Sequence, residues 1–402
     1  MILLTPEMDR RHFLKLALAA LAGASGCTHS EDYTDDDAVR LAAQMRDEAA
    51  RSGTGPYGPL RFSGYRGLAD LPWFELDAHG VLRTKAELPA VFDFHAHLGW
   101  AHLFAPPVDL LQRTPRIQYL LDCDRTDPPC TLDLDVYINA NFTEAMHDDL
   151  SREVRDSLLF GSQAAATHTI PNLLAEMDAV GVAKIAILPI ATGLPFGEDP
   201  TAHVLDAIAN SDAGERLIPF ASVHPRDVGW RTQLRGYAQR GVRGVKVHPE
   251  MQRLFPDEPA AMELYEECGR LNLPVIFHGG RSGIEPAFMR PYALIRRYVA
   301  AITSFPQVRF VLGHAGARDV ADAIPVAQQH ANVWLEISGQ GVTQLHELIH
   351  TLGYEKLLFG TDWPFYPLAA TLAKVLIVTK EHDPARAAIL HTNAERVLGT
   401  RT

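Results

Sequence analysis

The chain has 402 residues, of which 47% are hydrophobic and 21% are charged. These proportions are ordinary for a soluble globular protein, and the length allows one large domain with additional segments. The formal charge is −12 and the sequence has no basic stripe, so the composition argues against nucleic acid as a partner.

The first 27 residues are typical of an export signal. Arg10 and Arg11 are followed by Phe-Leu-Lys and a weakly apolar run, and the segment ends in Ala-Ser-Gly and Cys27. This order resembles a twin-arginine signal with a lipoprotein cleavage box. The apolar run at 13–22 is too short to span a bilayer as a helix. We expect an exported periplasmic or cell-envelope protein with a lipid anchor at Cys27; a buried N-terminal helix is the alternative.

Residues 28–88 are expected to form a tether and an N-terminal segment ahead of the main domain. An acidic run precedes a helical pattern at 38–51, and the Gly-Thr-Gly-Pro sequence at 53–56 ends that pattern.

Two of the four cysteines lie close together in a Pro- and Asp-rich stretch. Cys123 and Cys130 form either a disulfide, which an oxidising periplasm allows, or two free thiols. Cys268 falls in a helical pattern, and we expect it to be buried.

From residue 91 onward, short apolar runs alternate with amphipathic helical stretches. Strands that alternate with helices indicate parallel βαβ units, and eight such units close a barrel. The sequence therefore predicts a (β/α)8 TIM barrel over residues 89–400. An open doubly wound sheet is the alternative, but its glycine-rich phosphate turn does not follow the first strand. The eight expected strands cover residues 91–98, 182–190, 217–225, 241–249, 273–280, 308–316, 332–339 and 356–364.

The gap between the first two strands, residues 99–168, is an insertion. It is too long for a simple loop, so we expect it to have structure of its own. It leaves the C-terminal end of the first strand, where substrates bind in barrels. It is expected to be a lid or pocket wall, or else a surface excursion.

Histidines and an aspartate stand at the ends of four of these strands. His95 and His97 end the first strand and share a face by alternation, His278 ends the fifth, His314 the sixth and Asp362 the eighth. In a parallel barrel all strand ends meet at one rim, and burying these groups there without a partner would be costly. A satisfied pair of core histidines would explain the first strand alone. The full pattern predicts a metal site.

These residues lie in Asp-Phe-His-Ala-His at 93–97, Phe-His at 277–278, Gly-His-Ala-Gly at 313–316 and Gly-Thr-Asp-Trp-Pro at 360–364. In these motifs the chain resembles the amidohydrolase superfamily over about residues 90–400. Within it, the chain is similar to the amidohydrolase-related branch that includes aminocarboxymuconate-semialdehyde decarboxylase. The resemblance implies that His314 deprotonates or orients a water molecule. The metal ligands that it implies are His95, His97, His278 and Asp362.

Imidazole and carboxylate ligands suit one Zn(II) ion with a position left for water, whose pKa the metal lowers to about 7. His314 would then act as general base, and Asp362 would help to pass the proton to the leaving group. The same ligands also suit Mn, Fe or Co. The expected cofactor is therefore a divalent metal, with Zn(II) first.

Lys246 raises the question of a second metal, because some superfamily members carry a carboxylated lysine at the end of the fourth strand that bridges two metals. The Lys-x-His-Pro element that contains Lys246 and His248 is also familiar in the amidohydrolase-related branch, where one metal is usual. We expect one metal, with Lys246 or His248 lining the pocket, and two if Lys246 is carboxylated. His224 could line the pocket at the third strand, and a core position is the alternative for all three.

Arg281, Arg290 and Arg318 follow the fifth and sixth strands. An arginine there would either hold a substrate carboxylate or cap the barrel. Trp363 and Phe365 suggest an apolar pocket wall, or core packing.

Three functions are compatible with these observations. The first is hydrolysis of an amide, ester or lactone-like bond of a small molecule by metal-activated water. The second is non-oxidative decarboxylation of a small unsaturated or aromatic acid, since one fold hosts both reactions. The third is a lipid-anchored binding protein without turnover, against which the complete set of ligands argues.

Overall fold

The computed structural model describes residues 32–85, 87–101, 106–194 and 198–399. The expected export signal, including Cys27, lies outside the described residues.

Eight parallel strands at the centre of the molecule confirm the predicted (β/α)8 barrel. Each strand falls inside one of the predicted ranges but is shorter, because those ranges include polar residues of the loops that follow. The strands are β4 (Val91–Ala96), β6 (Val182–Ile187), β7 (Leu217–Pro219), β8 (Val245–Val247), β9 (Val275–Phe277), β10 (Phe310–Leu312), β11 (Val333–Glu336) and β12 (Leu357–Leu358).

Neighbouring strands pair in chain order around the barrel. β4, β6 and β7 form one parallel ladder, and β8 to β12 form another. A parallel bridge between Ala221 and Val245 joins the residues after β7 to β8, and a second bridge between Ala96 and Trp363 joins the residues after β12 to β4. The two bridges connect the ladders into a ring.

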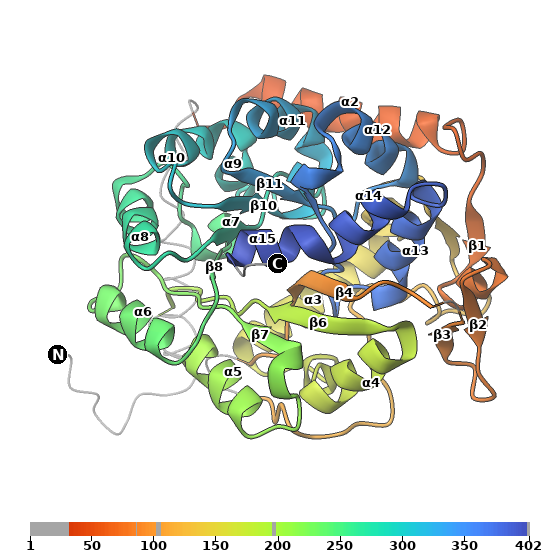
Figure 1. Cartoon of the computed structure of the whole chain (residues 1–402), viewed down its shortest axis with the longest axis horizontal. Helices are drawn as coiled ribbons and strands as arrows, with labels where there is room; N and C mark the ends of the chain where they lie inside the picture. The colour runs from red at the N-terminus through yellow and green to blue at the C-terminus, as the bar shows by residue number, and fades with distance from the viewer. Residues whose placement is uncertain (1–31, 86, 102–105, 195–197, 400–402) are drawn as a thin grey trace.

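A ring of helices surrounds the strands (Figure 1). Gly181, in the left-handed conformation at φ 76°, ends the first of them and lets the chain enter β6 directly. No helix in the described part of the chain is long and apolar enough to cross a membrane. The helices of the ring are, in chain order, α4 (Ile170–Val180), α5 (Pro200–Ala209), α6 (Trp230–Gln239), α8 (Pro259–Arg270), α10 (Val299–Ser304), α11 (Val320–Gln329), α12 (Val342–Leu352) and α13 (Leu368–Val378).

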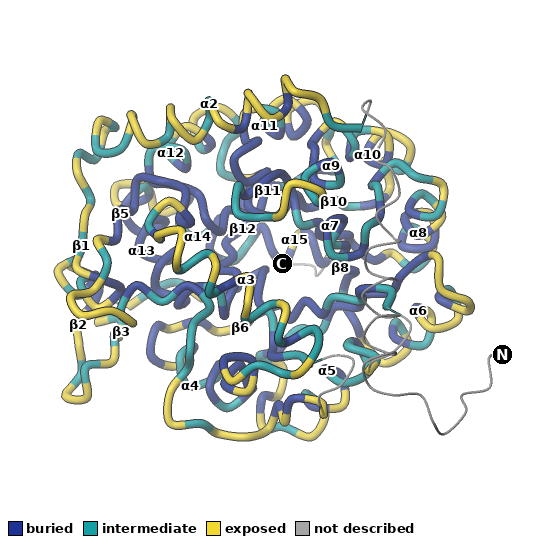
Figure 2. Tube along the Cα trace, turned by 180° about the vertical axis from the view of Figure 1, so that it is seen from behind, coloured by how far each residue is buried: buried dark blue, intermediate teal, exposed yellow. Residues whose placement is uncertain are grey.

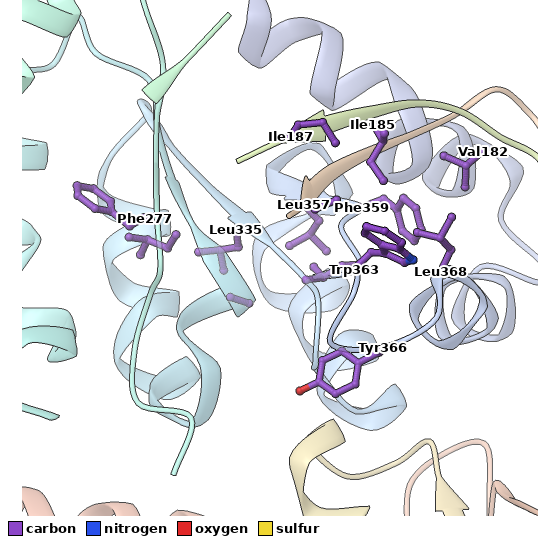
Figure 3. Close-up of a cluster of buried hydrophobic side chains, with 14 of the residues drawn as sticks. Val182, Ile185, Ile187, Phe277, Leu335, Leu357, Phe359, Trp363, Tyr366 and Leu368 are labelled. Carbon is purple, nitrogen blue, oxygen red and sulfur yellow. The ribbon is translucent and has the colours of Figure 1, made fainter. Parts of the chain in front are cut away.

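Apolar side chains fill the barrel in an inner and an outer layer. The inner layer includes Phe94, Phe220 and Val311, and helix α15 (Asn393–Leu398) covers it at the N-terminal ends of the strands. The outer layer packs the strands against the helices. Buried chain therefore runs through the centre of the molecule, and the exposed chain lies mainly on the outer helices and loops (Figure 2). Figure 3 shows part of the outer layer, with Ile185 of β6 near Phe359.

The described part of residues 28–88 is folded onto the barrel and does not form an extended linker. Helix α2 (Asp35–Arg51) begins three residues before the predicted 38–51, because Thr34 and Asp37 form a capping box. Along the described chain it is followed by the short strands β1 (Arg61–Ser63), β2 (Phe74–Leu76) and β3 (Leu82–Thr84).

The insertion at 99–168 has structure of its own, as predicted. It contains β5 (Thr131–Asp133), which pairs with β1, and α3 (Glu144–Leu159). Its two ends meet, because Gly99 N donates a hydrogen bond of 2.7 Å to His168 O.

The insertion also contacts the loops at the rim of the barrel. Ile138 N donates to Gly339 O after β11, at 2.8 Å, and Leu120 N donates to Pro364 O after β12, at 3.1 Å. Cys123 and Cys130 form a disulfide within it, and Cys268 of α8 is a buried free thiol, as expected.

Candidate active site

The predicted site residues lie at the rim formed by the C-terminal ends of the strands. His95 is in β4 and His97 follows that strand directly. His278 follows β9, His314 follows β10 and Asp362 comes four residues after β12.

His95, His97 and Asp362 form the centre of the site. The Nε2 atoms of His95 and His97 lie 3.5 and 3.4 Å from the same atom, Asp362 Oδ1. His97 Nδ1 lies 2.6 Å from the carbonyl oxygen of Leu188. Because a carbonyl only accepts, His97 donates from Nδ1, and its Nε2 faces Asp362. The side chains of His97 and Asp362 are each 12% exposed, so the centre is accessible from the rim.

Glu336, the last residue of β11, is a buried carboxylate that our sequence reading did not assign to the site. Its Oε2 accepts hydrogen bonds from His95 Nδ1 (2.6 Å), His314 N (3.1 Å) and Ser338 Oγ (3.0 Å). Burial raises the pKa of Glu336 to about 7, and the hydrogen bonds from Ser338 and His314 oppose that shift. The sequence contained a signal for Glu336, because Glu336 and Ser338 are polar residues two positions apart on one face of the strand predicted at 332–339.

A chain of hydrogen bonds fixes the protons of the next two imidazoles. The Ser338 hydroxyl donates to Glu336, so it accepts from His314 Nδ1 at 2.9 Å. His314 Nε2 is therefore unprotonated and accepts from His278 Nδ1 at 3.1 Å. Burial lowers the pKa of His314 to about 4, which keeps its imidazole neutral near pH 7. His278 Nε2 is left without a proton and without a hydrogen-bond partner.

The structure places His278 beside His248 and Glu250 and outside the group of His95, His97 and Asp362. The rings of His248 and His278 stack at 4.3 Å, and Glu250 Oε2 lies 3.5 Å from His278 Nε2. Glu250 is buried and its Oε1 has no hydrogen-bond partner. The ligand atoms of His248, Glu250 and His278 lie within 4.8 Å of one another, so this trio is a second place where a cation fits.

Lys246 of β8 points into the centre of the site. Its Nζ lies 3.1 Å from His95 Nε2, and its side chain is fully buried. Burial lowers the pKa of Lys246 to about 8. Lys246 and His248 thus both face the site, as alternation along the strand requires.

Asp93 connects β4 to the residues just before Asp362, a role that our sequence reading did not give it. Its Oδ1 accepts from His95 N (2.9 Å) and Thr361 N (3.1 Å), and its Oδ2 accepts from Thr361 Oγ1 (2.5 Å). These bonds fix the backbone on both sides of the His95–Asp362 contact.

Strained backbone accompanies two of the site residues. His314 and Asp362 have φ values of 55° and 61°, in the left-handed region that costs a non-glycine residue about 1–2 kcal/mol. Such strain persists only where surrounding contacts hold it, and it is common at functional sites.

Three residues considered for the pocket have other contacts. His224 Nε2 lies 2.9 Å from the Gln252 carbonyl oxygen and is not grouped with the ligands. Trp363 is fully buried in the outer core layer and donates from Nε1 to Glu176. Phe365 packs half-buried against the same core.

The three arginines of the rim are each paired with a carboxylate. Arg281 pairs with Asp319 at 2.6 Å and Arg290 with Glu285 at 3.2 Å. Arg318 pairs with Glu48, which belongs to helix α2, at 3.0 Å.

A divalent cation fits these residues on structural grounds. His278 Nε2 is buried without a hydrogen-bond partner, and Asp362 Oδ1 lies between the Nε2 atoms of His95 and His97. His95, His97 and Asp362 place their ligand atoms within 4.8 Å of one another. Nitrogen and carboxylate ligands are those that zinc and related metals prefer.

Solved structures share this fold. They include 5-carboxyvanillate decarboxylase LigW from Sphingomonas paucimobilis (17% identity, 77% of this chain and 99% of that chain, TM-score 0.53). An uncharacterised TIM-barrel protein from Bordetella bronchiseptica has 19% identity, 77% and 99% coverage and a TM-score of 0.51. A third is 2,6-dihydroxybenzoate decarboxylase from Rhizobium, with 16% identity over 78% of this chain and 99% of that chain and a TM-score of 0.50. The comparison with curated proteins returns no match.

The barrel and its rim of histidines define a metal-dependent enzyme of the amidohydrolase type. The sequence profile of the Amidohydrolase family matches residues 92–400, which is more than half of the chain. The chain therefore belongs to the amidohydrolase family, as the motifs indicated.

Proposed function

We propose that this enzyme hydrolyses an amide, ester or lactone-like bond of a small molecule, with a divalent cation held by His95, His97, His278 and Asp362. The cation would supply Lewis acidity and lower the pKa of water. His314 is the general base, because its Nε2 is unprotonated and Ser338 and Glu336 fix its ring. For His278 to join the other ligands, its ring must leave the contact with Glu250.

The ion pairs of the rim arginines are the observation that favours hydrolysis over decarboxylation. Decarboxylation of a carboxylic acid calls for a cation to hold the substrate carboxylate. Arg281, Arg290 and Arg318 are each paired with a protein carboxylate, so none of these three is free for that task.

Decarboxylation is the second candidate, and Lys246 favours it. This buried ammonium beside His95 is a partner for a substrate carboxylate. Lys246 also bears on the number of metals: we propose one zinc ion, and carboxylation of Lys246 would instead allow a second.

The test is a parallel screen of the metal-loaded protein on amides, esters, lactones and aromatic carboxylic acids. Hydrolysis predicts acid release without CO2, and the His314→Gln variant should bind about as much zinc as the wild type while losing about 10²- to 10⁴-fold in rate. Release of CO2 would refute hydrolysis and identify decarboxylation as the reaction. Full turnover in His314→Gln would refute the role of His314.

We also propose that the protein is exported and anchored by a lipid on Cys27. The order of Arg10, Arg11 and Cys27 supports this, and the disulfide between Cys123 and Cys130 suits an oxidising compartment. Palmitate labelling of the wild type and of Cys27→Ala tests it. Equal labelling, or none in either protein, would refute the anchor.

A further inference from the structure

Two rim loops carry His278 and His314, and they are bound to each other. We call them the β9 loop (278–283) and the β10 loop (313–319). The Arg281 guanidinium of the β9 loop donates from Nε and Nη2 to Asp319 of the β10 loop, at 2.8 and 2.6 Å. In return, Arg318 N donates to Arg281 O at 3.1 Å. The positions of the two histidines are therefore coupled.

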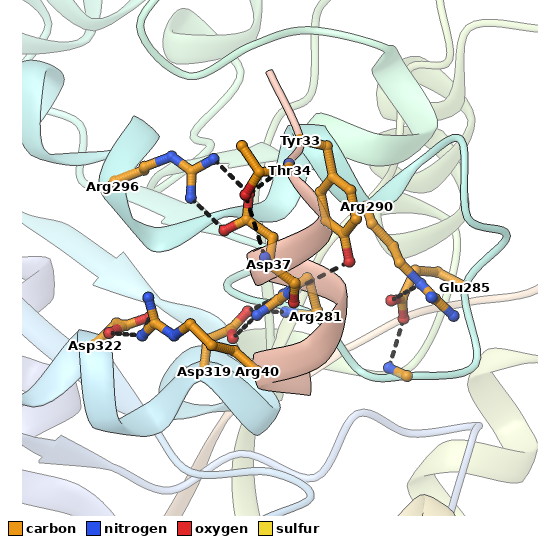
Figure 4. Close-up of polar contacts among 11 residues, drawn as sticks. Tyr33, Thr34, Asp37, Arg40, Arg281, Glu285, Arg290, Arg296, Asp319 and Asp322 are labelled. Atoms are coloured by element: carbon orange, nitrogen blue, oxygen red, sulfur yellow. Dashed lines mark hydrogen bonds and ion pairs between the residues drawn. The ribbon is translucent and has the colours of Figure 1, made fainter. Parts of the chain in front are cut away.

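Helix α2 binds the arginine of each loop (Figure 4 shows the contacts of Arg281). Arg281 Nη1 donates to the Asp37 carbonyl oxygen and, at 3.1 Å, to the Tyr33 hydroxyl. Arg318 Nε donates to Glu48 Oε2 at 3.0 Å. The Arg281 and Arg318 side chains are only 2% and 4% exposed, so their charges depend on protein partners and not on water.

The same helix also reaches the insertion and the outer ring of helices. Glu48 Oε1 accepts from Tyr137 N, and the Arg318 guanidinium lies 5.0 Å from the centre of the Tyr137 ring. Near the other end of α2, the Asp37 carboxylate pairs with Arg296 at 2.6 Å. A helix of 17 residues is about 25 Å long, so one rigid element contacts two catalytic loops and the insertion.

We propose that α2 is a clamp that positions the β9 and β10 loops, with Glu48 as its main positioning residue. The Amidohydrolase profile begins at residue 92, so this part of the site is built by residues outside the matched region. The clamp rests on the proposed function in one respect, namely that His278 and His314 serve the metal site. A misplacement of about 1 Å in such groups can cost about 100-fold in rate.

The test compares three variants of the full-length protein. Glu48→Ala removes both hydrogen bonds of the carboxylate, whereas Glu48→Gln keeps one acceptor oxygen. Arg40→Ala is the matched control, because Arg40 binds α2 through an exposed pair to Asp322 of α11, which lies outside both loops. The measurements are the dissociation constant of zinc alone, the visible spectrum of the Co(II)-loaded protein, and amide hydrogen exchange at 313–319.

Glu48→Ala should weaken zinc binding by about 10-fold, change the Co(II) spectrum and speed exchange in the β10 loop. Glu48→Gln should restore part of each effect, and Arg40→Ala should match the wild type. Wild-type affinity, spectrum and exchange in Glu48→Ala would overturn the clamp. If Glu48→Ala does not fold, the same criteria apply to Glu48→Gln.

The two proposals can fail separately. If the wild type binds no zinc, the proposed function fails and hydrogen exchange in the metal-free protein decides on the clamp. Faster exchange at 313–319 in Glu48→Ala than in Arg40→Ala would then support the clamp, and equal exchange would overturn it.

Discussion

At the scale of single residues, each imidazole of the site is oriented by the hydrogen bond of its other nitrogen. His95 binds Glu336, His97 binds the Leu188 carbonyl and His314 binds Ser338. Partners of this kind set the tautomer and the basicity of a ligand, and their loss commonly costs 10- to 100-fold in metal affinity. Glu336 therefore contributes to the proposed metal site by orienting His95.

Glu336→Gln should raise the zinc dissociation constant by about 10- to 100-fold. Glu336 Oε2 accepts from His95 Nδ1 and Oε1 accepts from Ser338 N. The amide has one acceptor oxygen where the carboxylate has two, so its NH2 group must face one of these two donors. Competition with a chromogenic chelator measures the effect. Glu263→Gln, which alters an exposed pair with Arg231, should bind zinc like the wild type. A change of less than about twofold in Glu336→Gln would mean that His95 is oriented by the fold alone.

At the scale of elements, the sequence predicted the parts that follow local rules. The eight strands were predicted because apolar runs alternate with helices. The strand-end positions of His95, His97 and Asp362 followed from the closure of parallel strands at one rim. The packing of α2 on the rim and the contact of Glu336 with His95 join residues that are 241 or more apart. Local periodicity carries no information about such contacts.

The close approach of the β9 and β10 loops depends on Gly280. This residue has φ 74°, and a Cβ atom there would lie 1.9 Å from Gly316 O. Gly280→Ala should therefore lower the free energy of unfolding by about 2 kcal/mol or more, in addition to the penalty for placing alanine at a positive φ. It should also weaken zinc binding by moving His278. Gly80→Ala is the control, because Gly80 has φ 73° with nothing within 4 Å of its Cβ position. Urea unfolding measures both variants. An equal loss of unfolding free energy in Gly280→Ala and Gly80→Ala would show that the two loops can separate freely.

At the scale of the whole molecule, the barrel, the insertion and the N-terminal segment share one hydrophobic core. Leu68 and Phe74 of the N-terminal segment and Leu121 of the insertion belong to the same buried cluster as barrel residues such as Leu312. We therefore expect the described parts to unfold together, so that a change at a junction between them alters the stability of the whole.

His168, at the end of the insertion, makes that stability depend on pH. Its Nε2 lies 2.8 Å from the Gln118 carbonyl oxygen and its ring lies against Trp363. Burial lowers the pKa of His168 from 6.5 to about 4. Between these values the unfolded chain binds more protons than the folded one, so the stability that neutral His168 contributes is present above pH 6.5 and lost as pH falls towards 4.

His168→Gln should remove this part of the acid lability. The free energy of unfolding of the wild type should fall by about 2 kcal/mol more than that of the variant between pH 7 and pH 4.5. Other buried histidines titrate in both proteins, so the difference isolates His168. His79→Gln, at an exposed position of the β2–β3 turn, should follow the wild type. Parallel pH profiles for wild type and His168→Gln would mean that the folded protein hydrates His168 on acidification. The junction between insertion and barrel would then open before the rest of the molecule unfolds.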